Sequence, residues 1–243
     1  PHLAKTIHAA AAALSLPLDR GTAHGATPCD NAAMSSPVFG GSRQRGALLL
    51  ADITGYTAFL QGVAEAHRAL IVDADEPPAA YAVLSHLLDT MVSSIAPTFR
   101  LAKFEGDAIF AVAVEDLPAG PDVLDCLRAC YASFRERLAA AGIEWTCTCS
   151  ACALGGLDLK FVLHHGDYVV QSIAGREELL GPDINIVHRL LKNHVREVIG
   201  PRPYALVTDA AAGALGIPTN GMIAAEETYD DTPPIAVHIL ALA

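Results

Sequence analysis

The chain has 243 residues, of which 52% are hydrophobic and 18% are charged, and its formal net charge is -11. This composition is that of a globular protein, and the length suffices for one large domain. The negative charge argues against binding to nucleic-acid backbones or anionic membranes, and no apolar run of about 18 residues suggests a transmembrane helix. Three of the six cysteines lie within residues 147–152, which fits a reducing compartment better than a disulfide framework. We therefore expect a cytoplasmic protein with neither nucleic-acid nor membrane partners.

Residues 1–45 differ in composition from the rest of the chain. The first part is rich in alanine, and the second is rich in Gly, Pro and Ser. Neither part shows the periodicity of a helix or a strand. We interpret this segment as an N-terminal arm and residues 46–243 as one domain.

A buried strand is predicted at residues 46–52 (GALLLAD), a continuous apolar run that ends in Asp52. The next residues turn directly into a helical stretch. Free N–H groups at the start of a helix favour an anion, and a carboxylate beside them can hold a divalent cation. The alternative for Asp52 is an N-cap of the following helix.

A hairpin is predicted at residues 101–113, where two apolar runs flank Glu105, Gly106 and Asp107. Glycine adopts positive φ without steric cost, which favours a tight turn here. Asp107 then lies at the end of a buried sheet, and Lys103 lies on the partner strand. This pair would suit a metal and a polar ligand, and the alternative is a turn with one ion pair.

Long helices are predicted at residues 79–95 and 121–141, because apolar side chains recur there at helical spacing. Gly142 is expected to end the second helix.

A cysteine-rich loop at residues 145–156 follows. Cys147, Cys149 and Cys152 form a C-x-C-x-x-C run whose spacing is typical of a zinc site. A structural zinc site needs four ligands, so another must come from elsewhere in the chain. The candidates for it are Cys126, Cys130, His164 and His165. The alternative is a set of half-buried thiols.

The C-terminal half is predicted to alternate strands and helices. The expected elements are a strand at residues 157–163, a turn at 164–167, a strand at 168–173, a loop at 174–181, a helix at 183–199, a strand at 203–207, a helix at 208–215 and two strands within 221–243. On the helix at 183–199, Asn185, Arg189 and Lys192 share one face, which is ordinarily a solvated face.

This order of elements predicts an α+β fold, a ferredoxin-like βαββαβ sandwich with extra C-terminal strands. Three blocks at this point resemble the class III nucleotidyl cyclases, the superfamily of most adenylate and guanylate cyclases. The blocks are residues 51–57 (ADITGYT), residues 103–107 (KFEGD), and residues 163–167 (LHHGD) followed by residues 181–189 (GPDINIVHR). The resemblance covers about residues 46–243, and the cysteine-rich loop is an insertion relative to the usual core.

The resemblance implies a metal site and a substrate site. Two Mg²⁺ or Mn²⁺ ions would be held by Asp52, Ile53 and Asp107, and would activate an attacking oxygen and stabilise phosphate charge. Residues that would contact the substrate in the first block are Thr54, Gly55 and Tyr56. A structural Zn²⁺ at the cysteines would be a further metal.

The resemblance also implies roles for four residues outside the metal site. Asn185 would position the ribose, and Arg189 would stabilise charge on the transferring phosphoryl group. Lys103 matches the base-reading lysine of adenylate cyclases. Glu178 falls at the second base-reading position, where adenylate cyclases usually carry aspartate. A second departure from the family pattern is Pro182-Asp183 after Gly181.

The activity implied is that of an adenylate cyclase-like lyase, which converts a nucleoside triphosphate, ATP before others, to a 3′,5′-cyclic nucleotide and pyrophosphate. The metal set and the ribose/arginine set normally face each other across a dimer interface, so a homodimer with shared active sites is implied. The alternative is a catalytically weak or inactive cyclase-fold module that binds a nucleotide or a regulatory partner.

Overall fold

The computed structural model describes residues 41–68, 79–114, 116–144, 150, 153–230 and 232–243. Cys147, Cys149 and Cys152, and residues 1–40 of the predicted arm, lie outside the described residues, so the zinc site and the arm stay predictions. Among the described residues, no helix is long and apolar enough to span a membrane.

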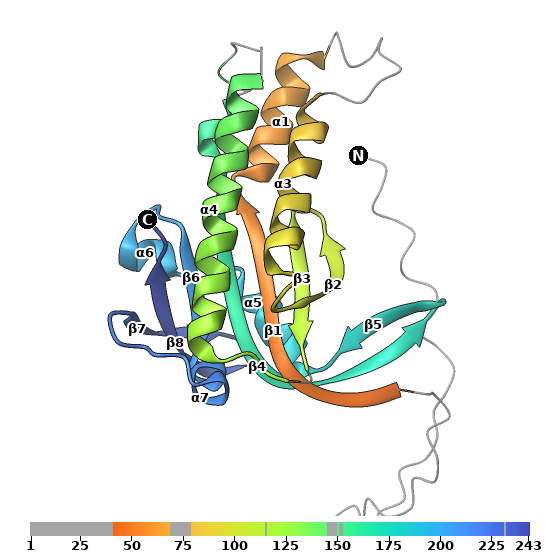
Figure 1. Ribbon diagram of the computed structural model, residues 1–243, viewed down its shortest axis with the longest axis vertical. Coiled ribbons are helices and arrows are strands. Elements are labelled where there is room, and N and C mark those ends of the chain that lie inside the picture. Colours follow the sequence, from red (N-terminus) through yellow and green to blue (C-terminus); the bar gives the residue numbers. More distant parts are fainter. Residues whose placement is uncertain (1–40, 69–78, 115, 145–149, 151–152, 231) are drawn as a thin grey trace, which may run out of the picture. The chain divides into compact units, whose positions relative to one another are not determined.

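The described part of the domain is built on an eight-stranded sheet (Figure 1). Its strands are β1 (Gly41–Thr54), β2 (Arg100–Glu105), β3 (Ala108–Ala113), β4 (Asp158–Ile173), β5 (Arg176–Leu180), β6 (Tyr204–Thr208), β7 (Ile223–Tyr229) and β8 (Thr232–Ala241). The helices are α1 (Tyr56–Ala66), α3 (Ala79–Ile95), α4 (Gly120–Glu144), the short 3-10 helix η3 (Leu154–Gly156), α5 (Pro182–Leu190), α6 (Val195–Ile199) and α7 (Asp209–Leu215).

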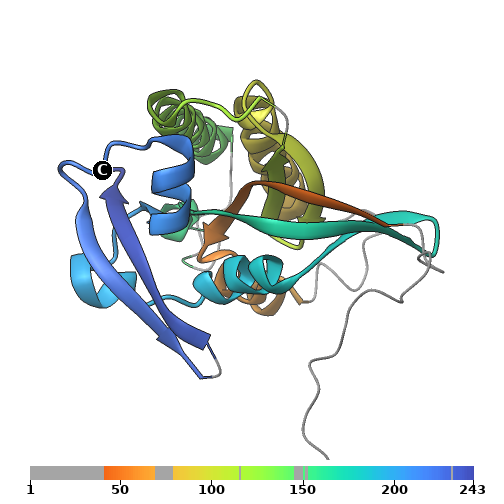
Figure 2. The same cartoon turned by 90° about the horizontal axis from the view of Figure 1, so that it is seen from below.

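The strand order is β2-β3-β1-β4-β6-β8-β7, with β5 paired to β4. The first four strands and helices α3 and α4 form the predicted βαββαβ core, in which each strand of the order β2-β3-β1-β4 is antiparallel to its neighbours. Figure 2 shows the sheet between two helical layers, with α3 and α4 on one face and α5 on the other. The ferredoxin-like prediction is therefore confirmed.

The apolar run of β1 is continuous because both of its faces are covered. Side chains alternate across a strand, so Leu49 and Ala51 join the core beneath α3 and α4, whereas Leu48 and Leu50 join the core beneath α5. All four side chains are fully buried. This double burial ends at Asp52, where the strand reaches the candidate site.

β4 corrects the prediction for residues 157–181. The predicted turn at 164–167 does not exist, because β4 continues through it opposite β1, with Gly166 paired to Gly46. His164 and His165 there are buried, whereas Asp167 is partly exposed. The hairpin turn lies instead at Ala174 and Gly175, both with positive φ, and part of the predicted loop forms β5.

Three element boundaries also differ from the prediction. β1 begins at Gly41 because its first residues pair with the distal part of β4. α4 continues past Gly142 to Glu144, since buried neighbours such as Leu138 and Ala141 offset the modest cost of glycine inside a helix. The helix predicted at residues 183–199 is broken into α5 and α6.

Candidate functional site

Asp52 and Asp107 lie side by side at one end of the sheet. Asp52 ends the apolar run of β1 opposite Ala108, and the Ile53 N–H donates a hydrogen bond to the main-chain oxygen of Asp107 (3.3 Å). Burial, followed by the nearby charge of Asp52, raises the pKa of Asp107. Two repelling carboxylates beside a carbonyl form a donor set that suits a divalent cation.

Lys160 is the cation beside this carboxylate pair. It lies opposite Asp52 on β4, and its Nζ is 3.0 Å from Asp52 Oδ2 and 3.1 Å from the main-chain oxygen of Leu191. Both charged side chains are mostly buried, with exposed fractions of 19% and 17%. Lys160 was not among the predicted site residues, although a lone lysine inside the apolar strand LDLKFVL was a usable signal.

The turn after Asp52 requires a glycine. Gly55 has φ +87°, and a Cβ on it would lie 2.4 Å from the main-chain oxygen of Gly156. Gly55 is also the N-cap of α1 and no side chain caps this helix, so Asp52 does not have the capping role considered as an alternative. The start of α1, with its free main-chain N–H groups, therefore lies only a few residues after Asp52.

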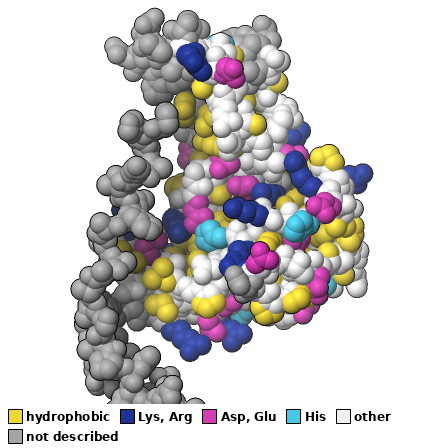
Figure 3. All heavy atoms as spheres, turned by 180° about the vertical axis from the view of Figure 1, so that it is seen from behind, with side chains coloured by type: hydrophobic (Ala, Val, Ile, Leu, Met, Phe, Trp, Pro, Cys, Tyr) yellow, Lys and Arg dark blue, Asp and Glu magenta, His cyan; other side chains and the backbone are white. Residues whose placement is uncertain are grey.

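A second polar cluster links the β2–β3 hairpin to β5 and α5. Lys103 Nζ lies 3.1 Å from Glu105 Oε1 and 3.6 Å from Glu178 Oε2. Glu105 also accepts hydrogen bonds from His188 Nε2 at 2.8 and 2.9 Å. Figure 3 shows the face opposite the view of Figure 1, where Lys/Arg, Asp/Glu and His side chains lie next to one another. The resemblance predicted Lys103 and Glu178 as the two base-reading residues, but the sequence gave no signal for Glu105 or His188.

The charges in this cluster stabilise one another. Burial alone would raise the pKa of Glu105, but hydrogen bonds from His188 and Lys103 outweigh it and lower that pKa. The hydrogen bond with Glu105 in turn raises the pKa of His188. The ring of Phe110 packs against the imidazole, with centroids 5.5 Å apart.

Asn185 and Arg189 share the exposed face of α5, as predicted, because Ile184 and Val187 fill the opposite face. Arg189 Nη1 donates to the main-chain oxygen of Asp230 (2.9 Å) and to Thr232 Oγ1. The β7–β8 turn therefore orients the guanidinium. Within the described residues, neither Asn185 nor Arg189 forms a hydrogen bond or ion pair with the carboxylates at the end of β1.

The first turn of α5 is fixed to β4 by Asp183. Its carboxylate accepts from the Asp167 N–H (2.6 Å) and lies 3.2 Å from His164 Nε2. His164 Nδ1 contacts Thr208 Oγ1 (2.9 Å) at the far side of the ring. A Cβ at Gly166 would collide with Asp183 at 2.2 Å. The departure at Pro182-Asp183 thus has a structural role, which is to hold α5 against β4.

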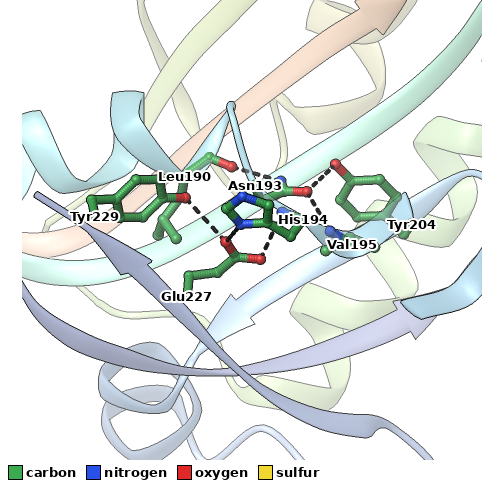
Figure 4. Close-up of polar contacts among 7 residues, drawn as sticks. All are labelled: Leu190, Asn193, His194, Val195, Tyr204, Glu227 and Tyr229. Carbon is green, nitrogen blue, oxygen red and sulfur yellow. Dashed lines mark hydrogen bonds and ion pairs between the residues drawn. The ribbon is translucent and has the colours of Figure 1, made fainter. Parts of the chain in front are cut away.

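The other end of α5 is fixed by Asn193 (Figure 4). Its amide nitrogen donates to the main-chain oxygen of Leu190 (2.6 Å), and its oxygen accepts from the Val195 N–H (3.1 Å) and from the Tyr204 hydroxyl (2.9 Å). These hydrogen bonds satisfy main-chain groups where α5 ends and α6 begins, which explains the break in the predicted helix.

Glu227 on β7 is the second anchor of this linker (Figure 4). Its side chain is 3% exposed and accepts from the His194 N–H and, through its other oxygen, from His194 Nδ1, both at 2.9 Å. The Tyr229 hydroxyl donates to it at 3.4 Å. A buried carboxylate needs such partners, so β7 restrains the end of α5.

The thiols of Cys126 and Cys130 donate hydrogen bonds to main-chain oxygens of α3, those of Ser94 and Met91. Burial, followed by Cys126, raises the pKa of Cys130 to about 12, which favours the thiol over the thiolate that zinc requires. Among the described residues, no cluster of three or more His, Cys, Asp or Glu could hold a metal ion.

Solved structures that resemble the described domain are nucleotidyl cyclases. The guanylyl cyclase Cya2 has a TM-score of 0.61 and 17% identity, with 84% of this chain and 100% of that chain covered. The adenylyl cyclase CyaB from P. aeruginosa has a TM-score of 0.56 and 12% identity, with 83% and 96% covered. A bacterial light-regulated adenylyl cyclase has a TM-score of 0.59 and 12% identity, with 83% and 52% covered.

The domain has a class III cyclase fold. This finding confirms the resemblance drawn from the three sequence blocks at the level of the fold. Because these structures carry both guanylyl and adenylyl cyclase names, the cyclase fold by itself does not decide the base.

Two sequence comparisons add relatives of undefined activity. A family model described as "Protein of unknown function (DUF2652)" matches residues 84–198. The Mycobacterium tuberculosis protein named "Uncharacterized protein Rv2561/Rv2562" is 35% identical over 136 residues, which is 54% of this chain. The match spans 60% of that curated relative's length.

Proposed function

We propose that the protein is a metal-dependent nucleotidyl cyclase that converts a nucleoside triphosphate, ATP before others, to a 3′,5′-cyclic nucleotide and pyrophosphate. The proposal rests chiefly on one observation. On the β2–β3 hairpin, Asp107 lies beside Asp52 and Lys103 lies beside Glu178, so the carboxylate pair and the base-reading pair each join residues that lie far apart in the sequence.

Asp52, Asp107 and the main chain of Ile53 would hold Mg²⁺ or Mn²⁺. Mg²⁺ is commonly bound through one or two carboxylates together with substrate phosphates, which matches this donor set. The bound metal would acidify the ribose 3′-hydroxyl and stabilise phosphate charge. Lys160, whose Nζ lies 3.0 Å from Asp52 Oδ2, would add a cation for the triphosphate.

The remaining groups would act on the nucleotide itself. The uncapped start of α1, at Thr54, Gly55 and Tyr56, offers main-chain N–H groups to phosphate oxygens. Arg189 would neutralise charge that develops on the α-phosphate, because a guanidinium matches phosphate oxygens in geometry and charge. Asn185, one turn earlier on the same exposed face of α5, would position the ribose.

Lys103 and Glu178 would read the base. An ammonium donates only, and an ionised carboxylate accepts only. A base edge with an acceptor beside a donor, such as N1 and the 6-amino group of adenine, satisfies both at once.

We further propose that the active enzyme is a homodimer with shared sites. Asn185 and Arg189 form no hydrogen bond or ion pair with Asp52 or Asp107 among the described residues of one chain, so a second copy would bring these sets together. The β4–β5 hairpin carries exposed apolar side chains that support such an interface. They are Val169, Ile173 and Leu180.

The decisive experiment incubates the purified protein with ATP, GTP, CTP or UTP in the presence of Mn²⁺ and measures cyclic nucleotide and pyrophosphate. We expect product with ATP in the wild type and a loss of at least about a hundredfold in Asp107→Ala, which removes half of the metal-binding carboxylates. Asp209→Ala, an exposed carboxylate on α7, is the matched control. Turnover unchanged in Asp107→Ala would contradict the proposal.

A nucleotide-binding module without turnover is the second candidate. Two contacts favour it, since Lys160 occupies Asp52 and Arg189 is bonded to the β7–β8 turn. Binding of a nucleoside triphosphate without any product in the same assay would identify this second function.

A further inference from the structure

Lys103 has two carboxylate neighbours, Glu105 and Glu178, although the proposed base site uses only Glu178 as an acceptor. Its Nζ is closer to Glu105 (3.1 Å) than to Glu178 (3.6 Å). All three side chains are partly shielded, with exposed fractions of 22–36%. An unpaired Glu105 at this position would compete with Glu178 for the ammonium.

His188 supplies the charge that balances Glu105. Its Nε2 contacts both oxygens of that carboxylate at 2.8 and 2.9 Å, and its Nδ1 lies 2.7 Å from the main-chain oxygen of Ile184. A carbonyl oxygen and an ionised carboxylate only accept, so both ring nitrogens donate and the imidazole is a cation. The cluster is then neutral, with two cations and two carboxylates.

We propose that His188 is a positioning residue of the base site, which holds Glu105 so that Lys103 and Glu178 form the donor and acceptor that read the base. This inference rests on the proposed nucleotide-binding function. It assigns to His188 a role different from that of its neighbours on α5, Asn185 and Arg189, because His188 acts through Glu105 and Lys103 rather than on ribose or phosphate.

A purely mechanical role for the same contact makes a different prediction. The Glu105–His188 bond also ties the β2–β3 hairpin to α5. If this tie were its only purpose, removing both partners would be at least as damaging as removing His188. In the charge-balancing role, removing both partners restores function, because the unpaired carboxylate disappears with its cation.

The test measures the affinity of the full chain for Mg²⁺–3′-deoxy-ATP, which cannot cyclise, by isothermal titration calorimetry. We expect His188→Ala to weaken this affinity about tenfold, which corresponds to about 1.4 kcal/mol. Glu105→Gln/His188→Ala should return to within about twofold of wild type. Inorganic tripolyphosphate, which has no base, should bind all variants equally.

His188→Gln is the second variant, because it keeps a donor for Glu105 without the charge, and it should fall between wild type and His188→Ala. Circular dichroism checks that every variant is folded. Affinity unchanged in both His188 variants, or a double variant no tighter than His188→Ala, would overturn the charge-balancing role while leaving the proposed function intact. A wild type that binds neither 3′-deoxy-ATP nor tripolyphosphate would instead overturn the proposed function and this inference together.

Discussion

Two carboxylates, Asp52 and Asp107, share one neighbouring cation at the end of the sheet. Lys160 reaches Asp52 from the adjacent strand, and its own surroundings are largely shielded from water. A charge in such a place interacts more strongly with ions than a surface lysine does. It also costs desolvation, which the hydrogen bond to the Leu191 carbonyl partly offsets. Replacing Lys160 therefore tests directly whether a charge at this end of the sheet contributes to binding of the polyphosphate.

Replacing Lys160 by alanine should weaken the binding of Mg²⁺–3′-deoxy-ATP about tenfold, because the polyphosphate loses one partly buried cation. Tripolyphosphate should lose affinity to the same degree, in contrast to the His188 variants. Calorimetry measures both. Lys192→Ala removes an exposed lysine close to the end of α5 and is the control, for which we expect no change. Equal affinities for Lys160→Ala and Lys192→Ala would show that Lys160 does not face the phosphates.

The turn between β1 and α1 and the linker between α5 and α6 hold the candidate groups in place. The first depends on the close approach of Gly55 to the main chain of Gly156. The second depends on side-chain hydrogen bonds from Asn193 and Glu227 (Figure 4). In both cases an element ends at a definite residue because a contact from a distant part of the chain requires it.

Gly55→Ala should destabilise the protein by about 1–3 kcal/mol, because alanine is strained at φ +87° and its Cβ would meet the Gly156 oxygen. Gly213→Ala is the opposite case: this glycine lies inside α7 with open space around it, and alanine should stabilise by about 0.5–1 kcal/mol. Urea denaturation at constant pH gives both free energies of unfolding. A neutral effect of Gly55→Ala would contradict the tight turn.

The hydrogen bond and ion pair with Glu227 raise the pKa of His194. A raised folded-state value means that this pair contributes its full stability below the ordinary histidine pKa of about 6.5. That contribution is lost as the pH rises through the higher folded-state value. The melting temperature of His194→Gln should therefore fall furthest below wild type at about pH 5.5, and the difference should narrow towards about pH 8.5. A difference that widens with pH would refute the assignment.

The domain as a whole combines a closed βαββαβ core with a hairpin, β4–β5, that carries several exposed apolar side chains. Exposing Val169, Ile173 and Leu180 to water is unfavourable in a monomer, whereas a symmetric pair of chains would bury them. The same pairing would bring the carboxylates of one copy to Asn185 and Arg189 of the other. Assembly and activity are thus expected to be lost together.

Ile173→Glu should keep the proposed homodimer from forming and abolish the proposed cyclase activity, because a charge in an apolar interface is costly to desolvate. Sedimentation velocity and the cyclase assay measure the two effects on the same sample. Val198→Glu, at a side chain of α6 with a similar exposed fraction (51% against 47%), controls for a surface charge and should change neither. A monomeric but fully active variant would contradict the shared site.

Local patterns in the sequence determined the buried strand that carries Asp52, the hairpin carrying Asp107 and the helix at residues 79–95. They did so because turn chemistry and side-chain periodicity act between near neighbours. The tertiary structure alone decided that residues 164–167 continue a strand and that Lys160 meets Asp52. It alone placed His188 against Glu105, a contact on which the inferred base site depends. Such contacts follow from strand register and helix placement, which are set by packing between distant segments and leave no local trace.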